Sequence, residues 1–399
     1  MSASAIVPEG YKQTEIGVIP KDWSVKKISQ IAPLQRGFDL PNNKLEKGHS
    51  PVVYSNGIMN YHSISMVKSP GVVTGRSGTL GVVHYIEQDF WPHNTTLWVT
   101  NFNNNSQIFV YFLYDFIGFK RFGSGSGVPT LNRNDAHDFL VAIPENFAEQ
   151  KSIARVLTDS DFQIQFLENL VSKKRYIKQG TMHEILTGKT RLPGFTDEWQ
   201  SKLLGDSATL KARIGWQGLT TAEYMENGEY LLVGGTEFNQ GFIDWSLCHH
   251  VEKIRYDQDR NIQLRNDDVL VTKDGTIGKV ALVKDAPKPA TLNSGVFVIR
   301  PKQNSFNSVF FYYLLLSRVF EEFLDRLVAG STINHLYQKD FVDFEFDLPP
   351  TIKEQEAIAE VLSDMDAEIA ALEERLEKAK AIKQGMMQQL LTGKIRLVD

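Results

Sequence analysis

Two glycine-rich turns contain the residue types that bind a phosphate or the edge of a base. "GRSGTLG" at residues 75–81 and "TKDGTIG" at residues 272–278 each combine a basic residue, short polar residues and glycines. Glycine lets the backbone approach a ligand closely, and the longer side chains can reach base edges. For either turn alone, glycine as an ordinary turn residue is an equally good explanation. Recurrence of the same donors in both turns favours binding.

Two further donor-rich segments follow these turns in the same order along the chain. They are "RFGSGSGVPTLNR" at residues 121–133 and "AGSTINHLYQ" at residues 329–338. We therefore predict two sets of residues that contact a nucleic acid. The first set is Arg76, Ser77, Thr79, Ser126, Asn132 and Arg133, and the second is Lys273, Asp274, Thr276, Asn334, His335 and Lys339.

The stretch "ILTGKTRLPGF" at residues 185–195 contains Gly-Lys-Thr, the residues with which phosphate-binding loops of NTPases end. Such a loop also needs a glycine five positions before the Gly-Lys pair, so that backbone N–H groups surround the phosphates. His183 occupies that position. Because a long predicted helix precedes the stretch, where a Walker loop would follow a strand, we predict no nucleotide site here.

No motif supports catalysis within this chain. An amino-methyltransferase would carry an Asn/Asp-Pro-Pro-aromatic motif, and "DLPPT" at residues 347–351 lacks both the adjacent acid and the aromatic residue. "FGSGSGV" at residues 122–128 follows a predicted helix, which is the wrong context for a dinucleotide loop. His249 and His250 have no further ligand at metal-site spacing, and the single cysteine, Cys248, is predicted to be a packing residue. We predict a non-catalytic chain without a cofactor or a metal of its own.

A long segment of the sequence occurs twice. Residues 149–192 align without a gap on residues 354–397, a shift of 205 residues, and about half of the positions are identical. "EQKSIARVLTDSD" pairs with "EQEAIAEVLSDMD", and "IKQGTMHEILTGKTRL" pairs with "IKQGMMQQLLTGKIRL". The repeat continues more loosely upstream, where "PTLNRNDAHDFLVAIP" matches "STINHLYQKDFVDFEFDLP" and "IPKDW" matches "FTDEW". Each half is therefore a globular module followed by a helix.

Heptad spacing of apolar residues predicts that the two repeated helices, residues 149–186 and 354–391, pair with each other. Polar residues interrupt the first seam at Ser160, Lys174, Lys178 and Thr181, and the second at Lys383. Each helix would be about 57 Å long, and an antiparallel pair would place the modules at opposite ends. The alternative is two separate helices, each covering its own module. The predicted pairing residues are Leu157, Ile164, Leu167, Val171, Ile185, Leu362, Met365, Ile369, Leu372, Leu376, Met386 and Leu390.

Strands are predicted in both modules, because short β-branched and aromatic runs alternate with Gly, Asn and Pro turns. One helix follows in each module, "QIFVYFLYDFIGFKRF" and "SVFFYYLLLSRVFEEFLDRL". The fold class is therefore α+β, with module 1 at residues 1–148, the central helix at 149–192, module 2 at 193–352, and the second helix and tail at 353–399. Because the same blocks end both helices and begin both modules, we predict a circular organisation with a pseudo-twofold axis.

Composition is that of an ordinary globular protein. The 399 residues suffice for two to three domains, and 42% are hydrophobic and 23% charged. No segment has the length and purity of a membrane span, and no export signal is recognisable, so we expect a cytoplasmic protein with no membrane partner. The net charge is −5, which counts as +1, +3, −6 and −3 over the four segments above. Contacts with a polyanion must therefore come from local patches or from a basic partner.

The order of module, helix with "EQ..IA.VL" and "LTGK.RL", second module and second helix resembles the DNA-specificity subunit of type I restriction-modification systems. The resemblance covers essentially the whole chain, and the duplicated blocks are its most specific part. It implies that each module is a target recognition domain for one half of a bipartite, asymmetric site in double-stranded DNA. It also implies that the helices form an antiparallel spacer that fixes the gap and docks two methyltransferase subunits, which restriction and translocation subunits join.

The resemblance further implies that S-adenosylmethionine, ATP and magnesium belong to the partner subunits. The missing methyltransferase and Walker motifs fit that division. Two other interpretations are possible. A two-module coiled-coil adaptor that binds protein rather than DNA would share the helices, whereas a self-contained methyltransferase or NTPase would need the absent motifs.

Overall fold

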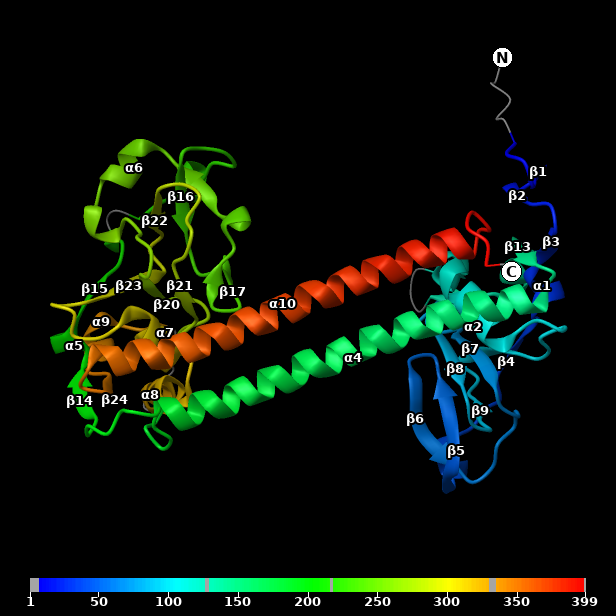
Figure 1. Cartoon of the computed structure of the whole chain (residues 1–399), viewed down its shortest axis with the longest axis horizontal. Coiled ribbons are helices and arrows are strands. Elements are labelled where there is room, and N and C mark those ends of the chain that lie inside the picture. The colour runs from blue at the N-terminus through cyan, green and yellow to red at the C-terminus, as the bar shows by residue number, and fades with distance from the viewer. Residues whose placement is uncertain (1–6, 126–128, 216–217, 330–334, 398–399) are drawn as a thin grey trace, which may run out of the picture. The chain divides into compact units, whose positions relative to one another are not determined.

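The computed structural model describes residues 7–125, 129–215, 218–329 and 335–397, and it divides into two compact units. Unit 1 comprises Met1–Asn169 and Glu373–Asp399, and unit 2 comprises Leu170–Leu372. Each unit therefore contains one predicted module together with parts of both long helices (Figure 1). In the described part of the chain, no helix is both long enough and apolar enough to cross a bilayer.

Module 1 is built on a four-stranded antiparallel sheet in the order β4-β10-β7-β8 and a three-stranded sheet in the order β6-β5-β9. Their bounds are β4 (Leu34–Arg36), β5 (Lys47–Tyr54), β6 (Gly57–His62), β7 (Gly71–Gly75), β8 (Val83–Ile86), β9 (Trp91–Pro92) and β10 (Thr96–Val99). Two-stranded antiparallel sheets in the described part of the module join β1 (Tyr11–Thr14) to β2 (Gly17–Pro20), β3 (Trp23–Lys27) to β13 (Leu140–Pro144), and β11 (Gly123–Ser124) to β12 (Thr130–Leu131). Its short helices are α1 (Ile28–Ile31) and α3 (Arg133–His137).

Module 2 repeats this plan with a six-stranded sheet in the order β15-β23-β20-β21-β18-β17 and a three-stranded sheet in the order β19-β16-β22. The strands are β15 (Ala208–Lys211), β16 (Tyr230–Val233), β17 (Phe238–Asn239), β18 (Phe242–Ile243), β19 (His249–Val251), β20 (Val269–Thr272), β21 (Val280–Leu282), β22 (Ala290–Leu292) and β23 (Val296–Pro301), and β14 (Gln200–Leu203) pairs with β24 (Glu345–Leu348). Its short helices are α5 (Leu204–Ser207), α6 (Lys253–Asp257) and α9 (Gln338–Phe341). The parallel pair β5·β9 of module 1 has its counterpart in β16·β22, so the modules share a topology that their sequences barely show.

The predicted aromatic helices are present, but both are shorter than expected. In module 1, α2 (Gln107–Ile117) ends at Gly118, whose φ of 69° is the left-handed conformation that terminates many helices. In module 2, the prediction of a single helix is wrong, because the chain forms two helices, α7 (Ser308–Leu315) and α8 (Arg318–Ala329). Ser317 separates them: its hydroxyl donates to the Leu314 carbonyl and its carbonyl accepts from Phe320 N–H. Serine thus competes with the helical bonds inside an otherwise apolar run.

The repeated segments form two long helices, α4 (Phe147–Leu186) and α10 (Ile352–Leu390). In unit 1 their facing residues are Asp161 with Lys383, at 2.6 Å, and Glu168 with Lys380, at 3.2 Å. Residue numbers rise along one helix as they fall along the other, so the two segments are antiparallel within this unit.

The same arrangement occurs in unit 2. Lys174 contacts Glu368 at 2.6 Å, and Lys178 contacts Asp366. Three lysines that interrupt the predicted seams, Lys174, Lys178 and Lys383, therefore each form an ion pair across the helices. These three lysines are satisfied by the partner helix, whereas Ser160 donates to the Val156 carbonyl of its own helix.

The predicted pairing residues divide between two environments. All twelve are buried or half-buried. Those near the helix ends join the module cores: Leu157, Met386 and Leu390 in unit 1, and Ile185, Leu362 and Met365 in unit 2. Residues nearer the middle, such as Leu167, Val171 and Leu372, are buried outside these two core clusters. The helices therefore both pair and cover modules, so each of the two interpretations describes part of the contact.

Two equivalent glutamines attach the long helices to the modules. Gln150 accepts the N–H of Ser106, the N-cap of α2, at 2.9 Å, and donates to the Pro144 carbonyl. Gln355 accepts the N–H of Asn307, the N-cap of α7, at 2.7 Å, and donates to Pro349. The second residue of each repeated "EQ" dipeptide, the glutamine, therefore fixes the aromatic helix of its module.

A buried glutamate and an arginine close unit 1. Arg396 donates to both carboxylate oxygens of Glu149, whose side chain is fully buried, and also to Asp22 at 2.6 Å. Trp23 Nε1 donates to Glu149 at 3.2 Å, and the guanidinium lies 5.8 Å from the Trp23 ring centre. These hydrogen bonds raise the pKa of Arg396 and lower that of Asp22. The C-terminal tail therefore binds the start of module 1, as the circular organisation requires.

Unit 2 contains the equivalent closure. Arg191 donates to both oxygens of Glu354 at 2.7 and 2.8 Å, and to the Asp197 carbonyl at 2.8 Å. Its guanidinium lies 5.9 Å from the Trp199 ring centre. In each unit, the glutamate at the first turn of one long helix binds the arginine that follows the other. We call these two contacts the Glu–Arg closures.

The glycine of each "LTGK.RL" block ends its helix. Gly188 and Gly393 have φ of 67° and 70°. Lys394 N–H donates to the Gln389 carbonyl and Gly393 N–H to Leu390, which is the bonding of a Schellman cap. A Cβ at Gly393 would lie 2.6 Å from Pro20 Cδ. This glycine is therefore a helix terminator packed on the first strands of module 1, and Gly188-Lys189-Thr190 is the equivalent turn in unit 2.

We predict that Arg396→Ala destabilises unit 1 by about 3–5 kcal/mol, because it leaves a buried carboxylate without its cation. Urea unfolding followed by tryptophan fluorescence would measure the loss. Adding Glu149→Gln to Arg396→Ala should restore part of it, since the neutral amide removes the buried charge. Arg375→Ala, at an exposed position on α10, is the matched control and should change stability by less than about 0.5 kcal/mol. Equal effects of Arg396→Ala and Arg375→Ala would contradict the closure.

Candidate DNA interface

The predicted turn of module 1 connects β7 to β8 and is bound to two other loops. Arg76 and Ser77 N–H groups donate to the Thr95 carbonyl at 2.8 and 3.1 Å. Leu131 N–H donates to the Arg76 carbonyl at 2.8 Å, and Ser77 forms a β-bridge with Thr130. The segment that contains Asn132 and Arg133 therefore lies beside the turn that contains Arg76 and Ser77.

Close backbone approach requires glycine in this turn. A Cβ at Gly75 would lie 1.9 Å from the Thr79 carbonyl oxygen, so the loop could not close with a side chain there. Gly78, with φ of 83°, takes the left-handed conformation that glycine adopts freely. Thr79 itself is exposed. The glycines thus have a conformational role, and the side chains between them remain free to contact a ligand.

A hollow of about 450 Å³ lies where these loops meet. Its lining includes three arginines, Arg36, Arg76 and Arg133. Arg36 was not predicted from the sequence; it ends β4 and reaches the site because β4 pairs with β10. The Arg36 guanidinium donates a hydrogen bond to the Asp39 carboxylate at 2.9 Å, and Arg76 donates to the Asn94 carbonyl. Residues with guanidinium, amide, hydroxyl and apolar side chains line the hollow: Arg36, Arg76, Leu97, Ser124, Thr130, Leu131, Asn132 and Arg133.

The β5–β6 hairpin tip adjoins the same loops. His93 N–H donates to the Val53 carbonyl at 2.9 Å, and the Tyr54 and His93 rings lie 4.3 Å apart. Burial lowers the pKa of His93, which favours the neutral imidazole. The carbonyl of Ser55, at the tip, lies 3.1 Å from the position of a Cβ on Gly75. One end of module 1 therefore gathers four loops that are distant in sequence.

Module 2 builds its loop cluster with equivalent backbone bonds. Lys273 N–H donates to the Gly295 carbonyl at 2.9 Å, and Leu336 N–H donates to the Lys273 carbonyl at 2.8 Å. Asp274 forms a β-bridge with His335, and their side chains also hydrogen-bond. These bonds reproduce those of Arg76 and Leu131 in module 1.

Leu131 and Leu336 make equivalent bonds and are 205 residues apart, which is the shift between the two repeated helices. The equivalent bridges of Thr130 and His335 extend this alignment upstream to residue 130. His335 is then the counterpart of Thr130, Tyr337 of Asn132, and Gln338 of Arg133. The looser sequence match had aligned "PTLN" with "STIN", which set Asn334 against Asn132. The shared backbone bonds overturn that alignment and locate an insertion before His335. Asn334 and Ser126 lie outside the described residues.

Two of the predicted residues of module 2, His335 and Lys339, lie next to an exposed tyrosine. Tyr337 is 52% exposed, and its ring centre lies 4.5 Å from that of His335 and 5.7 Å from the Lys339 ammonium. Lys273 lies 5.5 Å from the Phe297 ring centre, and Thr276 is exposed at the turn. Sequence reasoning missed Tyr337 because the insertion hid its register with Asn132.

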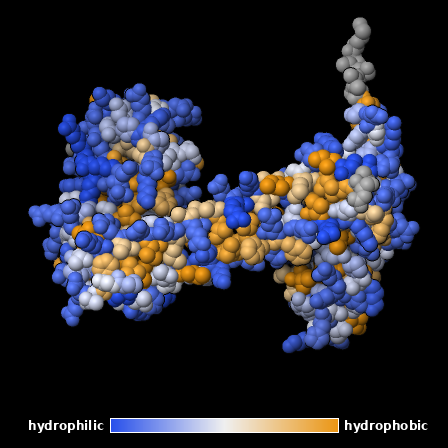
Figure 2. Space-filling view, viewed as in Figure 1, coloured by the Kyte–Doolittle hydropathy of each residue, from blue (hydrophilic) through white to orange (hydrophobic). Residues whose placement is uncertain are grey.

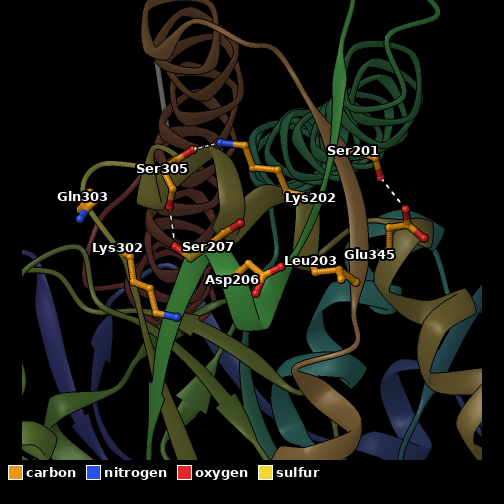
Figure 3. Close-up of a pocket in the computed structure, with 9 residues that line it drawn as sticks. All are labelled: Ser201, Lys202, Leu203, Asp206, Ser207, Lys302, Gln303, Ser305 and Glu345. Carbon is orange, nitrogen blue, oxygen red and sulfur yellow. Dashed lines mark hydrogen bonds between the residues drawn. The ribbon is translucent and has the colours of Figure 1, made fainter.

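A wider, open groove of about 1060 Å³ in module 2 contains none of the predicted residues (Figure 3). It lies beyond the C-terminal end of β23, whereas the Asn293–Gly295 turn of the loop cluster precedes β23. Its lysines bind the module's own backbone: Lys202 donates to Ser305 at 3.0 Å and Lys302 to Gly205 at 2.6 Å. We therefore assign this groove a structural role.

The cysteine of module 2 has a packing role. Cys248 is buried in a core cluster of module 2, and burial raises its pKa to about 12, so the thiol is inert. His249 and His250 lie on β19, and among the described residues no group of three or more His, Cys, Asp or Glu side chains could hold a metal ion.

Two α+β modules with equivalent loop clusters, joined to two long helices, define a two-module recognition protein. A family model described as "Type I restriction modification DNA specificity domain" matches residues 20–173 and 196–381. The chain belongs to this family, which confirms the resemblance drawn from the repeated motifs. The two matches also confirm the predicted duplication.

Similar proteins agree with this assignment. A type I restriction enzyme specificity subunit of Methanocaldococcus jannaschii, provisionally named MjaX, is 24% identical over 98% of this chain and 97% of its own length. The MjaVIII specificity subunit of the same organism is 25% identical over 68% of this chain and 66% of its own length. The crystal structure of a type I S subunit from M. genitalium has a TM-score of 0.64, with 14% identity, and the match covers 92% of this chain and 96% of that one. The α+β fold with long helices is therefore that of S subunits.

We predict that Arg76→Ala and Lys273→Ala each reduce the salt dependence of DNA binding. Loss of one phosphate contact lowers the slope of log K against log salt by about 1 and leaves the preferred sequence unchanged. Titrations of the reconstituted complex at several salt concentrations would measure the slope. Lys302→Ala, in the groove at the other end of β23, is the control and should keep the original slope. An altered sequence preference would show instead that the turn cations read bases.

Proposed function

We propose that this chain reads a bipartite DNA site, with module 1 contacting one half-site and module 2 the other. The observation that carries the proposal is the same loop cluster in both modules, built by Leu131 on Arg76 and by Leu336 on Lys273. The side chains on these shared backbones differ. Equivalent scaffolds that present different side chains suit an asymmetric site.

The chemistry of both clusters suits a duplex. Arginine and lysine bind phosphate oxygens, and amide, hydroxyl and guanidinium groups make directional bonds to base edges. In module 1 these groups surround a hollow with three arginines. In module 2, Lys273, Tyr337 and Lys339 lie together with His335. The local cationic groups support DNA contact despite the net charge of −5.

We assign catalysis to partner subunits and regard this chain as non-catalytic. Methyl transfer from S-adenosylmethionine, and ATP- and magnesium-dependent restriction, would then occur on two methyltransferase subunits and on restriction subunits. The sequence supports this division because it lacks a methyltransferase motif and a Walker loop. The turn at Gly188-Lys189-Thr190 has the residues that end a nucleotide-binding loop, but it caps α4 beside the Trp199 ring.

Exposed apolar residues on α4 support docking of a partner. In unit 1, Phe162 and Phe166 are 65% and 64% exposed, and in unit 2 Tyr176 is 75% exposed. Apolar side chains are visible on the surface of the long helices (Figure 2). Large aromatic residues left in water on a helix are typical of an interface. A methyltransferase subunit is the partner that we propose for this surface.

We predict that replacing residues 24–143 with the corresponding module of a relative alters only one half of the recognised sequence. The exchange leaves Trp23, Glu149 and Arg396 in place, so the Glu–Arg closure of unit 1 is retained. Mapping methylated positions in a genome that expresses the hybrid with its partner subunits would show which half changes. The matched exchange of residues 200–348 should alter the other half. Changes in both halves after one exchange would refute the modular assignment, and no DNA preference in either complex would favour the protein-binding adaptor.

A further inference from the structure

Arg133 and Gln338 occupy the same position in the two modules. Each is the first residue of a short helix, α3 or α9, and each follows an N-cap residue, Asn132 or Tyr337. The 205-residue register relates the two positions, as it relates Leu131 to Leu336. Both side chains are exposed, and no described residue forms a hydrogen bond or an ion pair with either of them.

Both residues lie beside the turn that carries the constant cation. Leu131 and Leu336, two positions earlier, donate to the carbonyls of Arg76 and Lys273 at 2.8 Å. Arg133 also lines the hollow that contains Arg76. A duplex that contacts the turn therefore lies within reach of Arg133 in module 1 and of Gln338 in module 2.

The turn position and the neighbouring helix position differ in whether the two modules carry the same type of side chain there. The turn position is a cation in both modules, Arg76 and Lys273. The helix position is a cation in module 1, Arg133, and a neutral amide in module 2, Gln338. A phosphate contact needs positive charge whatever the sequence, whereas a base contact must change when the base changes. The turn therefore has the property of a phosphate contact, and the helix position that of a base contact.

Side-chain chemistry indicates which bases fit. A guanidinium donates two parallel hydrogen bonds to guanine O6 and N7, and a carboxamide pairs with adenine by donating to N7 and accepting from N6. We propose that Arg133 reads a guanine in the half-site of module 1 and that Gln338 reads an adenine in the half-site of module 2. This inference rests on the proposed function, because it presumes that each module reads one half-site.

Exchange of the two side-chain types tests the proposal. The full chain, reconstituted with its partner subunits, would select from a pool of random duplexes, and the enriched sequences would be read by sequencing. Gln338→Arg should change one position of one half-site from adenine to guanine. Arg133→Gln should change one position of the other half-site from guanine to adenine. Each wild-type preference should be about 5- to 150-fold over the competing base.

Matched variants separate the possible causes of a change. Gln338→Ala should abolish preference at that one position and keep the rest of the half-site. Gln303→Arg makes the same substitution in the groove beyond the other end of β23 and should leave both half-sites unchanged. An unchanged adenine in Gln338→Arg would refute base reading by this residue, and loss of the whole half-site in both Gln338 variants would show a structural role and refute it equally. If the wild-type complex enriched no bipartite sequence, the proposed function itself would fail, which is a different result from either.

Discussion

Each unit depends on a buried glutamate that binds an arginine from the tail of the other long helix. Glu149 and Glu354 stand in the first turns of α4 and α10, and their side chains are almost fully buried. A buried carboxylate is tolerated only with a well-placed cation, which Arg396 and Arg191 supply with two hydrogen bonds each. The same contact joins a helix start to a helix end, and its arginine lies against a tryptophan, Trp23 at the start of β3 or Trp199 just before β14. It explains why the sequence repeats "EQ", "LTGK.RL" and an acidic residue followed by tryptophan.

The helix seam uses charge in a second way. Lys178 with Asp366 in unit 2 and Lys383 with Asp161 in unit 1 are the same pair, shifted by 205 residues. Such pairs contribute little stability, because desolvation offsets much of the attraction. They do oppose other registers, which would leave a lysine against apolar residues. The polar seam positions thus specify the antiparallel register, whereas Leu157 and Leu362, at the helix ends, are buried in the module cores.

Features that follow from the repeat and from local sequence patterns could be predicted from the sequence alone, whereas contacts made by strand pairing could not. The α+β class, the long helices, their antiparallel direction and the loops around Arg76 and Lys273 followed from local patterns and duplication. Arg36 could not be found, because only the pairing of β4 with β10 brings it to the hollow. The break at Ser317 was hidden within an apolar run. The match of Gln338 with Arg133 was obscured by an insertion, and backbone bonds to the turn revealed it.

The central claim is that one chain reads two half-sites at a separation set by α4 and α10. Adding one heptad to both helices, after Lys173 and after Lys378, keeps the seam, since seven residues restore the same face. The helices lengthen by about 10 Å, which corresponds to about three base pairs, and the second half-site rotates by roughly 100°. Selection of bound duplexes by the reconstituted complex should yield unchanged half-sites with a longer gap at reduced affinity, or no specific binding. Tight binding at the original gap would contradict the claim.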